Sequence, residues 1–403
     1  MPMASNGFDG IVDRFFQFDA GNDCPVRIAA AILEPDKWGR RRVVSGRGVT
    51  DEEAASRCFS EAVERQSAVF DEALDVIRAL PADLGDEAIE PRSLLLISNR
   101  QYLNAPAWNN RVNADHRLPP RLDKNQSIAW IKARSLFAQT IKFVPVAYCF
   151  LGYPQAIEEG FPIPDSNGLA SGERTADAIE RGFLELVERD AVSIWWYGRV
   201  RRPILNVDRD KLHLWKPFEE WIKKCGRKFW VLDLTHDLAL PVAAAISCDA
   251  RGCNLSLGFG AARTREEAAE SAMGELVQFE VTKSLQTQLH GSPFTSFLSW
   301  CMGANLEDYP FILPSDAASG QGAALSTAGT IDFELLRAKD LDVLVVDLAP
   351  QNGSTKAVRV VVPGLRSIWP RFAPGRLYNV PYQLGWHERR LDEAELNPVP
   401  ILY

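Results

Sequence analysis

The chain has 403 residues and a formal net charge of −8, and 46% of its residues are hydrophobic. The acidic balance argues against a nucleic-acid partner, and no run approaches the roughly 18 apolar residues of a membrane span. The first ten residues lack the basic and apolar regions of a secretory signal, so we expect a cytoplasmic protein with a substantial core and no membrane partner.

Cysteine and histidine give no sign of a metal framework. The seven cysteines are scattered, and the closest pair, Cys248 and Cys253, flanks an expected hairpin turn. An odd number of cysteines without a CxxC pair predicts reduced thiols, mostly in the core, and no zinc site. The five histidines are far apart and show neither metal-ligand spacing nor a triad motif.

The first part of the chain alternates expected strands and helices. In chain order these are strands over 26–33 and 41–45, a helix over 51–78, a strand over 93–98, a helix from 128 and a strand over 143–151. Residues 98–125 are polar and rich in Asn and Pro. A connection of this length inside a compact domain is usually functional or mobile, so we interpret it as a lid or docking segment.

The central stretch begins at Asp165 as a Gly-containing loop and continues into a long helix that carries Trp195 and Trp196. After it we expect a helix over 209–225, strands over 229–234, 241–247 and 253–258, a helix over 265–288, a surface excursion over 303–325, and strands over 343–348 and 358–362. The pattern predicts an α+β protein in which sheet layers carry three helices. Boundaries inside it are weakly marked, so we treat 1–403 as one unit with parts 10–160, 161–300 and 301–403.

The three long helices repeat one arrangement of polar residues. Each follows a Gly-bearing loop and a threonine suited to cap it, at Thr50, Thr175 and Thr264. Helical spacing places four polar residues of each on one face: Glu53, Arg57, Glu61 and Glu64; Asp177, Arg181, Glu185 and Glu188; Glu267, Ser271, Glu275 and Gln278. One such stripe alone is best interpreted as a solvated helix face, whereas the repetition favours a shared site.

Converging carboxylates repel one another and raise their pKa values unless cations are present. Hard oxygen ligands suit Mg²⁺, which completes its shell with water and phosphate oxygens. Arg65 and Arg189 offer forked donors for phosphate, and helix N-termini after glycine loops favour anions. A nucleoside triphosphate with Mg²⁺ fits these groups. The chain has no GxxxxGK[ST] motif, and Gly258-Phe-Gly260 lacks the third glycine of a dinucleotide fingerprint, so neither a P-loop nor a Rossmann site is expected.

At these residues the sequence resembles the YcaO superfamily, in its azoline-forming peptide cyclodehydratase branch. The likeness rests on the loop Ser166-Asn-Gly-Leu-Ala-Ser-Gly172, on Leu184-Glu-Leu-Val-Glu-Arg-Asp-Ala191 and on the helices around Glu61 and Glu275. It extends from about Gly10 to the Pro363-Gly-Leu-Arg366 turn and the proline-containing tail. The resemblance implies a YcaO-like fold with three repeated strand–loop–helix units.

The resemblance also implies ATP and Mg²⁺ as cofactors, and it assigns residue roles. Catalysis is assigned to Glu185, Glu188 and Arg189. The metal ligands would be Glu61, Glu64, Glu185, Glu188 and Glu275. The ATP site would comprise Glu61, Glu64, Arg65, Ser166, Asn167, Ser171, Asp177, Glu275 and Gln278.

In the family chemistry a Cys, Ser or Thr side chain attacks the preceding amide carbonyl, ATP phosphorylates the resulting oxygen, and phosphate leaves to give a thiazoline or oxazoline. The substrate would be a ribosomal precursor peptide. The resemblance further implies a homodimer, a separate leader-peptide-binding partner of the E1-like or RRE-containing kind, and a flavin dehydrogenase acting later. Two alternatives remain open, ATP-dependent thioamidation and a non-catalytic scaffold that retains the fold.

Four departures from the family pattern bear on the ligand set. Arg57 stands where a small hydroxyl residue is more common, Glu173 where Asn is usual, and Asp177 in place of a longer Glu. The tail keeps only Pro398 and Pro400 of the alternating proline ending.

Overall fold

The computed structural model describes residues 10–18, 21, 23–112, 116–288, 300–316, 331–348 and 355–401, with the side chains of 285–288 left aside. The chain forms two compact units, each assembled from separate stretches. Unit 1 consists of Met1–Phe59, Val187–Gly329 and Tyr378–Tyr403, and unit 2 of Ser60–Leu186 and Thr330–Leu377. Three of the boundaries between these stretches fall inside helices α1 (Asp51–Ser67), α7 (Thr175–Gly198) and α12 (Arg376–Gln383).

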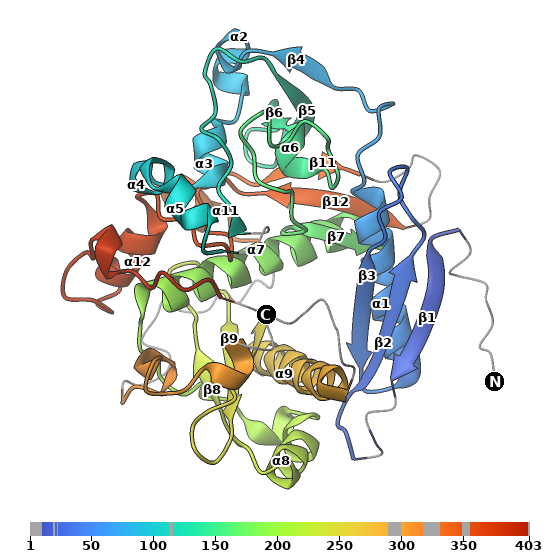
Figure 1. The fold of residues 1–403 in the computed structure, drawn as a ribbon, viewed down its shortest axis with the longest axis vertical. Helices are drawn as coiled ribbons and strands as arrows, with labels where there is room; N and C mark the ends of the chain where they lie inside the picture. Colours follow the sequence, from blue (N-terminus) through green and yellow to red (C-terminus); the bar gives the residue numbers. More distant parts are fainter. Residues whose placement is uncertain are drawn as a thin grey trace. The chain divides into compact units, whose positions relative to one another are not determined.

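Unit 1 contains two antiparallel three-stranded sheets (Figure 1). The first has the order β1 (Val12–Phe18), β2 (Arg27–Leu33), β3 (Val43–Gly48), and the second has the order β10 (Ser256–Ala261), β9 (Val242–Cys248), β8 (Lys228–Asp233). Helix α9 (Arg265–Gln288) packs on β9 and β10 and also contacts β3. Every residue of β9 is buried, as expected for a central strand covered on both faces.

Helix α8 (Trp215–Lys224) completes the core of unit 1 beneath β8. Its buried face presents Trp215, Phe218 and Ile222 at helical spacing. These side chains join Ala243, Ala245, Leu276 and Val277 in one buried cluster. The turns η3 (Arg209–Lys211), η4 (Pro310–Ile312) and η5 (Glu393–Glu395) also belong to this unit.

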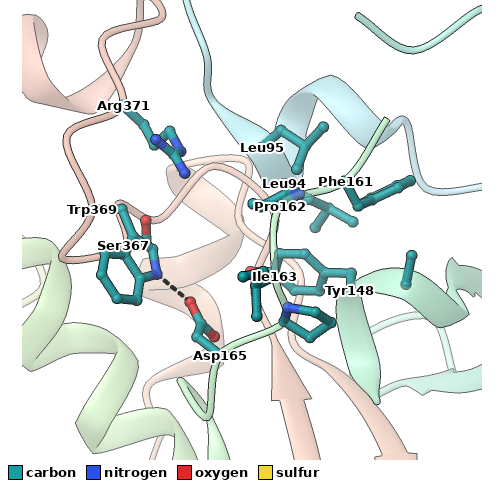
Figure 2. Close-up of a pocket in the computed structure, with 12 residues that line it drawn as sticks. Leu94, Leu95, Tyr148, Phe161, Pro162, Ile163, Asp165, Ser367, Trp369 and Arg371 are labelled. Atoms are coloured by element: carbon teal, nitrogen blue, oxygen red, sulfur yellow. Dashed lines mark hydrogen bonds between the residues drawn. The ribbon is translucent and has the colours of Figure 1, made fainter. Parts of the chain in front are cut away.

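Unit 2 is built on a six-stranded sheet, all of whose pairings are antiparallel. Its order is β4 (Ile77–Ala79), β5 (Ile128–Ser135), β11 (Leu344–Asp347), β12 (Lys356–Val361), β7 (Leu169–Gly172), with β6 (Ile141–Pro145) beside β5. The short helices are α2 (Pro81–Leu84), η1 (Gly85–Glu87), α3 (Pro91–Leu95), α4 (Asn99–Leu103), α5 (Ala105–Asn109), α6 (Val146–Cys149) and α11 (Phe333–Ala338). A pocket opens on this unit, with Tyr148, Ile163, Asp165 and Trp369 among its lining residues (Figure 2).

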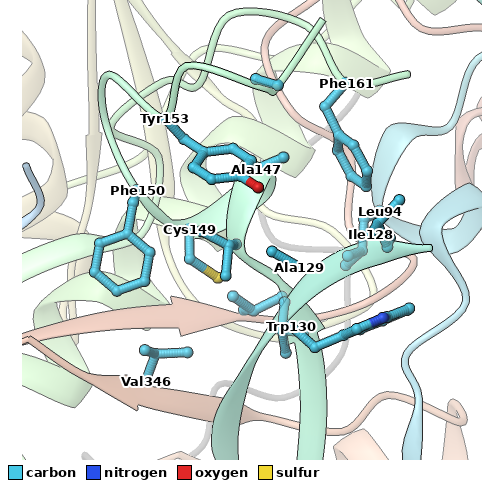
Figure 3. Packing of buried hydrophobic residues seen from close by; sticks show 14 of the residues in the cluster. Leu94, Ile128, Ala129, Trp130, Ala147, Cys149, Phe150, Tyr153, Phe161 and Val346 are labelled. Carbon is cyan, nitrogen blue, oxygen red and sulfur yellow. The ribbon is translucent and has the colours of Figure 1, made fainter. Parts of the chain in front are cut away.

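The core of unit 2 lies around β5 and α6. Trp130 and Phe161 are fully buried there, beside Cys149 and Phe150 (Figure 3). Phe70, just beyond α1, meets Tyr153 edge to face at 4.8 Å between ring centroids. This packing fixes the end of α1 against the unit that carries Ser171.

Most expected elements are present, including the strands at β2, β3, β8, β9, β11 and β12 and the whole of α9. In three places the type of the expected element was wrong. Residues 91–95 form helix α3 instead of a strand, because Pro91 starts a helical turn and the short apolar run after it carries no periodicity of its own. Residues 128–135 form strand β5 instead of a helix, because burial between two neighbouring strands outweighs the helix propensity of Ala, Lys and Arg. Residues 146–149 form α6 within the expected strand over 143–151.

The first long helix ends at Ser67 and does not reach residue 78. The chain leaves the helix because Phe70 N–H donates to Leu151 O at 2.9 Å and Leu151 N–H donates to Ala68 O at 2.8 Å. Residues 98–112 contain α4 and α5, and Gln101 is buried against Pro370 and Phe372. A lid or docking role for this segment stays a prediction. Residues 317–325 of the expected excursion over 303–325 lie outside the described residues.

Among the residues that the structure describes, no helix combines the length and apolar character needed to cross a bilayer. All seven cysteines are free, and five of them are buried, as expected for cysteines that lie mostly in the core. Cys248 and Cys253 flank a turn in which Asp249 N–H donates to Cys253 O at 2.9 Å.

Candidate active site

The three strand–loop–helix repeats are present and match in register. They are β3 with α1, β7 with α7, and β10 with α9. The residues immediately before the helices are Thr50, Arg174 and Thr264. Counted from these positions, Glu61, Glu185 and Glu275 are equivalent, and so are Glu64, Glu188 and Gln278.

The threonine caps are confirmed for two of the three helices. The hydroxyl of Thr50 accepts from Glu53 N–H, and the hydroxyl of Thr264 accepts from Glu267 N–H, each at 3.2 Å. Thr175 is the first helical residue of α7 and not its cap, because Ala178 N–H already bonds Arg174 O at 3.2 Å. The middle repeat is therefore aligned one residue earlier than the threonine suggested.

Glycine lets each helix lie directly on its strand. A Cβ at Gly46 would come within 2.2 Å of Ala54 O and Cys58 N, and one at Gly260 within 2.4 Å of the equivalent Ala268 O. No side chain fits at such distances, so the helix backbone rests against the strand backbone. This close contact fixes where each polar stripe lies.

Unit 2 brings Glu61, Glu64 and Arg65 of α1 to the strand of the second repeat. Glu64 Oε1 accepts from the N–H of Ser171 at 2.9 Å and from its hydroxyl at 3.0 Å. Arg65 pairs with Glu61 at 3.1 Å, one helical turn away. Ser171 itself is buried.

Glu185 completes the carboxylate cluster of unit 2, and its Oε2 accepts from Gly168 N–H at 3.0 Å. The pKa of Glu64 is raised to about 7: burial is the largest cause, the two hydrogen bonds from Ser171 oppose it, and the charges of Glu185 and Glu61 add to the rise. A divalent cation would offset both burial and repulsion. The donor chemistry of this cluster therefore fits Mg²⁺.

The Ser166–Gly168 loop is held by residues that the sequence did not indicate. Asp165 accepts from Asn167 N–H at 3.0 Å and from Asn167 Nδ2 at 2.8 Å. Arg359 of β12 donates to both the main chain and the side chain of Asp165, and the Trp369 indole also donates to that carboxylate (Figure 2). Ser166 contributes its carbonyl to Leu169 N–H. Only the loop itself had a sequence signal; Arg359 and Trp369 are remote in sequence.

Asp177 lies at the exposed start of α7, where it pairs with Arg174 at 2.6 Å. The hydrogen bond from Arg174 lowers the pKa of Asp177. Arg181, one turn later, donates to Ser171 O at 3.2 Å. Asp177 thus serves the local helix start.

In unit 1, Glu188 and Arg189 form a largely buried ion pair at 3.3 Å. The next residue, Asp190, is fully buried and faces His236 Nε2 at 3.2 Å. Leu238 N–H donates to His236 Nδ1 at 3.2 Å, and Asp237 lies 3.3 Å from the same nitrogen. Histidine spacing in the sequence gave no signal for this pair.

Gln278 and Glu275 of α9 are oriented by the neighbouring strands of unit 1. Gln278 Oε1 accepts from Arg47 at 3.1 Å, and its Nε2 donates to Ser45 Oγ at 2.9 Å. Glu275 accepts from Phe259 N–H at 2.5 Å. Arg47, inside the glycine loop before α1, is a further site residue that sequence reasoning missed.

Within the described ranges, no three or more His, Cys, Asp or Glu side chains are grouped as a metal site. Glu64, Glu185 and Glu275 each accept a backbone N–H. A carboxylate has about four lone-pair acceptor sites, so one or two hydrogen bonds orient it and leave other sites available to a ligand. The carboxylates remain chemically able to bind a cation or to organise water.

The model of the YcaO cyclodehydratase family, described as ATP- and Mg²⁺-binding, matches residues 45–366. A solved heterocyclase in complex with substrate and cofactor is 32% identical, with a TM-score of 0.86, and covers 98% of this chain and 55% of its own. The heterocyclase TruD is 33% identical, with a TM-score of 0.73, over 88% of this chain and 51% of its own. This chain thus spans about half the length of these two.

A YcaO protein from Methanopyrus kandleri, solved with AMPPCP and Mg²⁺, shares the fold at 20% identity and a TM-score of 0.61, over 90% of this chain and 91% of its own. The α+β architecture and the repeated helices are therefore those of this family. The family match covers most of the chain and includes all three polar stripes. The chain belongs to the YcaO cyclodehydratase family, whose members bind ATP and Mg²⁺.

Proposed function

We propose that this protein is an ATP- and Mg²⁺-dependent cyclodehydratase that converts Cys, Ser or Thr of a ribosomal precursor peptide into thiazoline or oxazoline. The observation that carries the proposal is the cluster of Glu61, Glu64 and Glu185 beside the Ser166–Ser171 loop. It occurs in a chain that is about one-third identical to two heterocyclases.

The reaction requires removal of a carbonyl oxygen under mild conditions. The side-chain thiol or hydroxyl loses its proton as its sulfur or oxygen attacks the preceding amide carbon, and the former carbonyl oxygen takes the γ-phosphoryl group of ATP. Phosphate then leaves with that oxygen as the C=N bond forms, and the amide nitrogen loses its proton. The net result is loss of one water from the peptide, with ATP converted to ADP and phosphate.

The protein's share of such chemistry is positioning and charge neutralisation. Glu61, Glu64 and Glu185 would hold Mg²⁺, with Glu188 and Glu275 as further candidate ligands. The ion would neutralise phosphate charge when bound. Arg65 and Arg189 would pair with carboxylate or phosphate, as their present contacts to Glu61 and Glu188 illustrate.

Nucleotide contacts are proposed for Ser166, Asn167, Ser171, Asp177 and Gln278. Asn167 and Ser171 are supported best, because both are buried and fixed by carboxylates. Gln278 keeps one N–H and one lone pair beyond its bonds to Ser45 and Arg47. To contact the nucleotide, Asp177 would have to break its ion pair with Arg174.

We propose as partners a precursor peptide, a leader-peptide-binding protein, and a flavin dehydrogenase that would oxidise azolines to azoles. A homodimer in the cytoplasm is the expected form. The support for these partners and for the homodimer is the chain's membership of the YcaO family.

Phosphate release with Mg²⁺ and ATP, measured with and without peptide and partner, tests the proposal. Glu64→Gln should abolish peptide-stimulated release, because the variant cannot carry the negative charge. Glu87→Gln changes an exposed carboxylate of the same unit and is the matched control. Equal release by both variants would contradict the proposed site.

A further inference from the structure

Arg359 is a buried arginine that belongs to none of the repeated helices. Arg359 lies in β12, is 1% exposed, and pairs with Asp165 at 3.1 Å. A buried ion pair often adds little net stability, because burying the charges costs free energy, so we consider which segment this pair positions.

The pair holds the Ser166–Gly168 loop from one side. Arg359 Nη1 donates to Asp165 O at 2.7 Å, and Arg359 pairs across the sheet with Leu169. The next residue of β12, Val360, donates its N–H to Gly168 O at 2.8 Å. A Cβ at Gly168 would lie 2.3 Å from Val360 O, and Gly168 has φ +79°, so the strand and the loop are in direct backbone contact.

The carboxylate of Asp165 then fixes the Asn167 side chain. A carboxylate only accepts hydrogen bonds, so the Asn167 amide must turn its NH₂ toward Asp165, as observed at 2.8 Å. The amide oxygen Oδ1 is thereby directed away from that carboxylate. Among the described residues, no donor bonds this oxygen. An oriented amide oxygen suits Mg²⁺ or its bound water.

We propose that Arg359 is a positioning residue for the Mg²⁺–nucleotide complex: through Asp165 it fixes the orientation in which Asn167 offers Oδ1 to the ion or to its hydration shell. This inference rests on the proposed function. Arg359 touches neither nucleotide nor peptide in this scheme. Outer partners that orient a metal ligand typically contribute 10- to 100-fold to metal affinity or activity.

The test measures the affinity of the full-length chain for AMPPNP by calorimetry, with Mg²⁺ and with EDTA. Arg359→Met should weaken Mg²⁺–AMPPNP binding at least about tenfold, and Asp165→Asn should do the same. The double variant should be no weaker than either single one, because both act through one pair. In EDTA the variants and the wild type should bind alike.

Arg366→Met is the matched control for loss of a buried arginine. Arg366 is 2% exposed in the same unit and bonds the carbonyls of Ala373 and Pro374. Its loss should lower Tm without changing AMPPNP affinity at a temperature where circular dichroism shows the variant folded. If Arg359→Met does not fold, Arg359→Lys and Asp165→Asn carry the test.

Three results would overturn the inference: unchanged affinity in folded Arg359 and Asp165 variants, an equal loss in Arg366→Met, or a loss that persists in EDTA. Failure of the proposed function looks different, because the wild type itself would then bind no AMPPNP with Mg²⁺, and both proposals would fall. If the wild type binds AMPPNP with Mg²⁺ and the variants bind it equally well, only the proposed role of Arg359 is wrong.

Discussion

Glu64 of α1 accepts two hydrogen bonds on one carboxylate oxygen from Ser171 of β7, residues 107 positions apart in the sequence. The contact joins the first polar stripe to the strand of the second repeat within unit 2. It also opposes the burial that disfavours the charged form of Glu64.

Ser171→Ala should destabilise the protein by about 1–2 kcal/mol, because a buried carboxylate loses a hydroxyl donor. It should also raise the pKa of Glu64 further, since one bond to its charged form is removed. Urea unfolding at pH 8 measures the first effect. Ser193→Ala is the control, because the buried Ser193 hydroxyl has no partner in the described part of the chain; equal losses would contradict the account.

Glu64→Gln should change how stability depends on pH. The pKa of Glu64 is raised from 4.5 to about 7 in the folded protein. Protonation of Glu64 therefore stabilises the folded wild type fully below pH 4.5, and this stabilisation is lost as the pH rises through 7. The variant lacks this loss and should gain about 1–2 kcal/mol relative to wild type between pH 4.5 and 7.5. Parallel profiles of unfolding free energy would refute the assignment, and infrared titration of labelled Glu64 gives a direct check.

Gly46→Ala should destabilise unit 1 by about 3 kcal/mol or more, because its Cβ would lie 2.2 Å from backbone atoms of α1. Gly303→Ala is the control, since a Cβ there meets nothing within 4 Å. Thermal unfolding compares the two. A mild effect at Gly46 would mean that α1 does not rest on β3 as described.

Arg47→Met should raise the KM for ATP severalfold with little change in kcat, because Gln278 loses the donor that orients its amide oxygen. Steady-state phosphate release gives both constants. Arg42→Met removes an arginine that pairs with Asp36 at 3.0 Å in the same unit, and its KM should stay near the wild-type value. A fall in kcat alone for Arg47→Met would assign Arg47 a different role.

The repeated helices could be predicted because their signal is local. Glycines, capping residues and polar stripes fall at fixed spacings, and Glu61, Glu185 and Glu275 were aligned correctly even though the cap of α7 is Arg174. Those spacings follow from helix geometry, which does not depend on the rest of the chain.

Contacts between segments remote in the sequence could not be predicted. Arg359 meets Asp165 from 194 positions away, and Arg47 meets Gln278 from 231. The sequence marks neither pair, because a single sequence does not encode locally how distant strands, loops and helices are brought together. The same limit explains β5, whose strand conformation depends on its neighbours β4 and β11.

The most direct test of the central claim is ATP consumption with Mg²⁺, followed by the mass of a Cys-containing precursor peptide incubated with the protein and its leader-binding partner. The account predicts peptide-dependent phosphate release and the loss of one water for each phosphate released, both absent in Glu64→Gln. Replacement of oxygen by sulfur would indicate thioamidation, and no turnover or binding of ATP with partners present would show that the polar stripes are structural.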